Sequence, residues 1–88
     1  MNSPIEEMYI RQLAHHIDIP YLRNGTLRPV DVILNPEDYP EEYKMFMESN
    51  LSLPIDINDK REIIDGLDRL VKSWIMCKHK VKVRKIHK

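Results

Sequence analysis

Basic side chains gather at the C-terminal end of the chain, where phosphate binding is the first chemistry to consider. Residues 72–88 hold seven of the 14 Lys and Arg residues and none of the 14 acidic ones. Clusters of this kind bind phosphate backbones by releasing condensed counterions, and they also attract acidic protein surfaces. The candidate nucleic-acid-binding residues are Lys78, Lys80, Lys82, Arg84, Lys85 and Lys88.

One observation weighs against a sequence-reading RNA module in this basic run, and another offers a reading without any ligand. Proteins that bind single strands usually place aromatic side chains among the basic ones for base stacking. Here Trp74 is the one aromatic residue near the run, and its place in an apolar stripe assigns it to the core. Lysines on an edge strand also block edge-to-edge association. The run therefore fits DNA or RNA, an acidic protein, or a solubilising role alone.

Acidic side chains are densest in the segment around two tyrosines. Residues 1–71 hold all 14 Asp and Glu but only seven Lys and Arg, a formal charge of −7 against +7 for residues 72–88. Many acidic residues of this kind only cap helices or lie on helix faces that are exposed to water. Tyrosines within a charged patch, however, are typical of protein-binding hot spots. The candidate protein-binding residues are Glu37, Asp38, Tyr39, Glu41, Glu42 and Tyr43.

The four histidines and the single cysteine do not predict a metal site. His15 and His16 are adjacent, so on a helix their side chains point about 100° apart. One residue separates Cys77 from His79, whereas paired zinc ligands are usually separated by about two to four. A nucleophilic Cys77 would need a base and oxyanion donors. We expect it instead to be a small residue at the end of a helix.

The sequence carries no recognisable catalytic motif. There is no phosphate-binding glycine loop, dinucleotide fingerprint, zinc-protease motif or nucleophile elbow. A paired-carboxylate centre would need a cleft that separates two pKa values, and no pattern in the sequence supplies one. We therefore predict no catalytic residue, no metal ligand and no cofactor.

The elements that must position these residues begin with a predicted helix. Ser3 and Glu6 have the spacing of a capping box, and Pro4 suits the first helical position. Apolar residues recur at helical spacing from Ile5 onwards, and Pro20 ends the helix.

Residues 21–34 have the pattern of extended chain. Asn24-Gly25 is a strong turn signal and predicts a small hairpin. Residues 30–34 are rich in β-branched side chains that alternate between two faces, which predicts a strand.

Two further helices are expected in the second half of the chain. Residues 40–49 predict a short one, followed by an apolar connector at 51–57. The clearest helix starts at Asp59, where Glu62 completes a capping box, and its apolar stripe runs to Ile75. Gly66 lies inside that stripe at a cost of about 1 kcal/mol relative to Ala, so we expect another backbone to approach it closely.

Strand periodicity returns after the last helix. Val81 and Val83 alternate with Lys82 and Arg84. This segment either pairs with the strand at 30–34, with its valines facing the core and its lysines facing outward, or remains a mobile basic arm.

These elements predict an α+β fold, with three helices packed on a small two- to three-stranded sheet and a C-terminal basic strand or arm. The 88 residues suffice for one core. We assign 1–79 to the compact domain and 80–88 to the basic strand or tail, which belongs to the same domain if it pairs. The absence of a signal-like leader, of a cysteine pair and of an apolar run long enough for a membrane span predicts a cytoplasmic protein without membrane contact.

The function class that follows is binding rather than catalysis. We predict a small non-enzymatic regulatory protein, an accessory or phage-type modulator or inhibitor, that binds a larger protein through its charged surface. One alternative is a nucleic-acid-binding protein that uses the C-terminal Lys and Arg run. Another is a homo-oligomeric structural protein in which the acidic body of one copy pairs with the basic end of the next.

Overall fold

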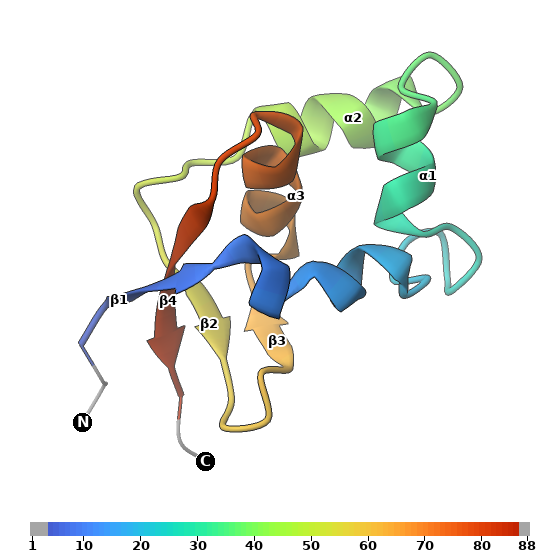
Figure 1. Ribbon diagram of the computed structural model, residues 1–88. Coiled ribbons are helices and arrows are strands. Elements are labelled where there is room, and N and C mark those ends of the chain that lie inside the picture. The colour runs from blue at the N-terminus through green and yellow to red at the C-terminus, as the bar shows by residue number, and fades with distance from the viewer. Residues whose placement is uncertain (1–3, 87–88) are drawn as a thin grey trace.

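The computed structural model describes residues 4–86, and these form four strands, three α-helices and two short 3-10 helices (Figure 1). The strands are β1 (Glu6–Tyr9), β2 (Ile55–Ile57), β3 (Ile63–Asp65) and β4 (Lys80–Lys85). The α-helices are α1 (Pro29–Leu34), α2 (Pro40–Met47) and α3 (Leu67–Ile75), and the 3-10 helices are η1 (Ile10–Gln12) and η2 (Ala14–Asp18). The fold is α+β as predicted, with one strand more than expected.

The basic C-terminal segment is an interior strand of a mixed sheet. The strand order is β1-β4-β2-β3, with β4 antiparallel to β1 and parallel to β2. Val81 and Val83 are buried while Lys80 and Lys82 are exposed, so the predicted alternation is confirmed. The predicted partner at 30–34 is wrong, because that segment is a helix and both edges of β4 are occupied by β1 and β2.

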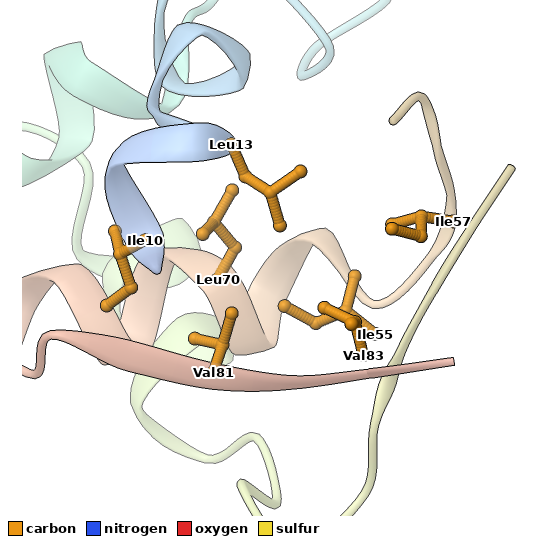
Figure 2. Packing of buried hydrophobic residues seen from close by; sticks show 7 residues of the cluster. All are labelled: Ile10, Leu13, Ile55, Ile57, Leu70, Val81 and Val83. Carbon is orange, nitrogen blue, oxygen red and sulfur yellow. The ribbon is translucent and has the colours of Figure 1, made fainter. Parts of the chain in front are cut away.

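Two apolar clusters form the core, and α3 contributes to both. The sheet core consists of Ile10, Leu13, Ile55, Ile57, Leu70, Val81 and Val83 (Figure 2). The helical core consists of Leu27, Val32, Phe46 and Val71. Leu70 belongs to the first cluster and Val71 to the second, so α3 joins the two. The molecule is elongated, with extents of 41 × 24 × 20 Å.

The predicted N-terminal helix is wrong. Glu6–Tyr9 pair with β4 in the register Glu6 to Val83 and Tyr9 to Lys80, and two 3-10 turns follow. Met8 packs on the sheet core, whereas Ile5, which the helical pattern placed inside, is exposed. Pairing with a strand that needs a partner therefore outweighs local helix signals. Ser3 of the predicted capping box lies outside the described residues.

The strand predicted at 30–34 is also wrong, since Pro29–Leu34 form α1. Pro29 occupies the first turn, where its missing N–H costs nothing. The Asp31 carboxylate accepts the Arg28 backbone N–H at 3.2 Å and the Arg28 guanidinium at 3.0 Å. Helical spacing buries Pro29 and Val32 and leaves Leu34 exposed. The hairpin turn at Asn24-Gly25 is present, with a single bridge between Leu22 and Leu27.

The helix predicted from Asp59 starts later, while α2 lies within the predicted 40–49. Asp59 lies in the turn between β2 and β3, where the Asn58 side-chain oxygen accepts the N–H groups of Lys60 and Glu62. Gly66 is the residue before α3, with φ +100°. The predicted close approach is confirmed, because a Cβ there would lie 3.2 Å from the Ile55 Cα.

Replacement of Gly66 tests this junction. Gly66→Ala combines a left-handed backbone with a contact against β2, so we expect a loss of about 2–3 kcal/mol in the free energy of unfolding. Gly25→Ala is the matched control, because Gly25 has φ +85° but its nearest non-neighbouring atom, the Pro20 carbonyl oxygen, is 3.7 Å away. Urea denaturation of both variants measures the difference. Equal losses would show that the approach of β2 contributes nothing.

Candidate functional site

A cleft with an apolar floor and basic sides opens at the end of α3. Its volume is about 480 Å³. Ile10, Ala14 and Trp74 supply apolar surface, and Arg11, Lys78 and His79 supply basic groups, while Tyr9 and Cys77 complete the lining. Among residues 4–86, no carboxylate lines it. We refer to this site as the Tyr9 cleft.

Strand pairing builds the cationic side of this cleft. Tyr9 lies opposite Lys80 in the register of β1 and β4, and the Ile10 N–H donates to the His79 carbonyl oxygen at 2.9 Å. The Lys80 ammonium lies 5.1 Å from the Tyr9 ring centroid and the Arg11 guanidinium 4.5 Å from it. Both distances are in the range of cation–π attraction. Tyr9 therefore holds two cations at one point of the surface.

The predicted basic residues separate into different environments. Lys78 lines the Tyr9 cleft, and Lys80 lies against the Tyr9 ring; both are exposed. Lys78, Lys80 and Lys82 also line a neighbouring hollow together with Glu7, which faces Lys82 in the strand register. Farther along β4, Arg84 forms an ion pair with Asp56 at 3.1 Å. Lys85 is half-buried, and Lys88 lies outside the described residues. The exposed basic side chains of the run are therefore concentrated at the start of β4.

Sequence reasoning missed Tyr9 and Arg11, and it placed Trp74 in the core alone. About 70 residues separate Tyr9 from the basic run, so only the antiparallel register brings them together. Trp74 does pack on the sheet core, but it also lines the cleft. In the folded chain, aromatic side chains therefore do lie beside the basic residues, although none of them is interleaved with these residues in the sequence.

The predicted protein-binding residues lie together on α2 and the turn before it. Glu37, Asp38 and Glu41 are exposed, while Tyr39 and Tyr43 are half-buried against the helical core. Arg23 donates two hydrogen bonds to the Glu42 carboxylate, at 2.7 and 3.0 Å, and these lower the pKa of Glu42. The tyrosines thus serve packing, and the exposed apolar residue beside the acids is Leu34.

Among the histidines, His16 is buried and fully hydrogen-bonded. Its Nε2 donates to the Arg61 carbonyl oxygen at 2.8 Å, since a carbonyl can only accept, and its Nδ1 then accepts from the Tyr21 hydroxyl at 2.6 Å. Burial lowers the pKa of His16 from its usual 6.5, the Arg61 carbonyl opposes this, and His15 adds to the lowering. The fold therefore holds neutral His16.

Neither a cluster of metal ligands nor a membrane-spanning helix is found in the described part of the chain. Nowhere in residues 4–86 do three or more His, Cys, Asp or Glu side chains gather as they would around a metal ion. None of the helices in this part of the chain combines the length and apolar character needed to span a bilayer. Cys77 is exposed and follows α3, with φ +57°.

Comparisons with protein-family models, curated proteins and solved structures found no match. The charges and shape of the Tyr9 cleft are therefore the basis for proposing a function.

The bonds of His16 predict a pH dependence of stability. In the unfolded chain the His16 side chain takes up a proton near pH 6.5, whereas in the folded chain it does so at lower pH. Between these two pH values the unfolded state therefore binds more protons than the folded state. We expect the melting temperature to fall as pH is lowered below 6.5, measured by circular dichroism. His16→Gln should flatten this slope, and His15→Gln should reduce it only in part, because burial is the larger cause of the lowered pKa of His16. An unchanged slope in His16→Gln would contradict the assignment.

Proposed function

We propose that this chain is a non-enzymatic nucleic-acid-binding protein that holds a single strand in the Tyr9 cleft. The observation that carries the proposal is the fixed pair of cations on Tyr9, beside an apolar floor and without a carboxylate in the lining. A strand of nucleic acid offers the complementary chemistry, since its phosphates are anionic and its bases have apolar faces.

Phosphate contacts are the first part of this proposal. Arg11 and Lys78 line the cleft, and Lys80 lies beside it against the Tyr9 ring. Arg11 can bond two phosphate oxygens with its planar fork, whereas lysines act as point charges. Three neutralised phosphates would release counterions and make binding depend steeply on salt.

The apolar floor supports the second part. Trp74 and Ile10 lie between the cations and the sheet core, in a cleft of about 480 Å³. A base placed there would bury one face against apolar atoms, and such stacking is worth about 1–3 kcal/mol per base. Because every base has a similar face, we expect little sequence preference.

The helices favour a single strand over a duplex. A major groove is most often read by an exposed helix, although a two-stranded β-ribbon also fits it. No residue of α3 is fully exposed, because the helix lies between the two cores, and α2 carries Glu41, Glu42 and Glu48 near its surface. Neither helix is suited to approach a polyphosphate backbone.

Fluorescence anisotropy with labelled dT12 and U12 oligonucleotides tests the proposal. We expect affinity to fall roughly 20-fold between about 50 and 200 mM salt, as three phosphate contacts require for a single strand. Tyr9→Leu should weaken binding about tenfold because it removes the ring that holds Arg11 and Lys80. Tyr9→Phe keeps that ring and should bind nearly as well as the wild type.

A charge-matched pair separates local contacts from net charge. Lys80→Glu should weaken binding strongly. Lys60→Glu makes the same change in the turn between β2 and β3, at the other end of the sheet, and should have little effect. No binding to either oligonucleotide at about 50 mM salt, or equal losses in the two variants, would overturn the proposal.

A second candidate function is protein docking at the acidic end, as the sequence predicted. The observation that favours it is the 71% exposure of Leu34, beside the carboxylates of Glu37 and Asp38. An exposed leucine rimmed by charge is the arrangement of a small hot spot. A basic surface with an apolar recess on a larger protein would complement it, and occupation of that surface is how a small regulator would act.

Affinity capture from the host cells, read by mass spectrometry with nuclease treatment, tests this candidate. Leu34→Ser and Glu37→Lys should each lose the partner at unchanged stability, because exposed substitutions usually change stability by less than about 0.5 kcal/mol. Leu53→Ser replaces another exposed leucine away from the acidic end and should keep it. A partner captured equally by all variants would contradict docking at Leu34.

A further inference from the structure

A second groove lies at the opposite end of α3 from the Tyr9 cleft. It opens between α2 and β3, with a volume of about 370 Å³. Tyr21, Met45 and Ile64 form its rim, and all three are exposed apolar or aromatic side chains. Phe46 and Leu67 lie at its base. Exposed apolar side chains that converge on one groove mark an interaction site more often than scattered ones do.

The groove runs beside the outer edge of β3, which pairs with no other strand of the described chain. β3 is the last strand in the order β1-β4-β2-β3, and its other edge pairs with β2 through Asp56 and Asp65. A free edge presents unpaired N–H and C=O groups that can accept another strand. An extended segment could therefore pair with β3 and place alternate side chains in the groove.

The charges of the groove select the occupant. Asp65 and Asp68 line it, and no Lys, Arg or His side chain does. Two copies of this chain paired through β3 would add a second Asp65 and a second Asp68 to the same edge, and like charges close together on a strand pair are destabilising. Basic side chains on the incoming strand would instead meet these acids.

We propose that the groove between α2 and β3 binds an extended segment of a partner protein in which apolar residues alternate with Lys or Arg. The segment adds a strand at the edge of β3, its apolar side chains pack on Met45 and Ile64, and its basic side chains approach Asp65 and Asp68. This site is independent of the Tyr9 cleft, so either can fail without the other.

NMR titration of the full ¹⁵N-labelled chain tests the proposal with a blocked heptapeptide of alternating Lys and Val as the probe. We expect saturable shift changes centred on Ile64, Asp65 and Met45. The same peptide with Glu in place of Lys should not bind, and neither should one with Gly in place of Val. Shifts centred on Glu37 and Glu41, or equal binding of the Gly peptide, would overturn the proposal by showing charge attraction alone.

A matched pair of methionines provides the control. Met45 and Met76 are both 48% exposed, but Met76 follows α3 and lies outside the groove. Met45→Ser should weaken the peptide roughly fivefold to tenfold, and Met76→Ser should not. Asp65→Asn should weaken it about threefold at low salt. Equal effects of the two methionine variants, or concentration-dependent shifts at Ile64 without peptide, would reject this occupant, the latter in favour of a second copy.

Discussion

The packing of α3 on both sides is the constraint on which the rest of the structure depends. Leu70 and Trp74 face the sheet core, and Leu67, Val71 and Ile75 face the helical core. Its basic residues also turn inward, since Arg69 donates to the Pro54 carbonyl at 2.8 Å and Lys72 to the Ser49 carbonyl at 2.9 Å. A nine-residue helix thus holds the sheet, the other helices and the 49–54 loop together.

The two candidate sites lie where α3 begins and where it ends. At its start the left-handed Gly66 lets the chain turn sharply out of β3, which leaves the groove between β3 and α2. At its end the turn through Cys77 leads into β4 and leaves the Tyr9 cleft. Carboxylates line the first opening and cations the second. The two candidate sites therefore follow from how the helix is entered and left.

Patterns that tertiary pairing reinforces could be predicted from the sequence, and patterns that it opposes could not. The valines of β4 alternate because one face of the sheet is buried, and α2 has a clear apolar side. Helical spacing in Glu6–Tyr9 and Ile63–Asp65 misleads, because these short segments pair with strands far away in the chain. The Tyr9 cleft could not be predicted for the same reason, since its aromatic and basic residues become neighbours only through that register.

Among residues 4–86, one ion pair joins the acidic and the basic halves of the sequence. In the middle of the sheet Arg84 pairs with Asp56, and Lys82 lies opposite Glu7 in the strand register. On the acidic side Arg23 engages Glu42. Charged groups also gather locally, with cations around Tyr9 and carboxylates around Leu34 and Ile64. A binding role for this chain therefore rests on small sites where charge adjoins apolar surface.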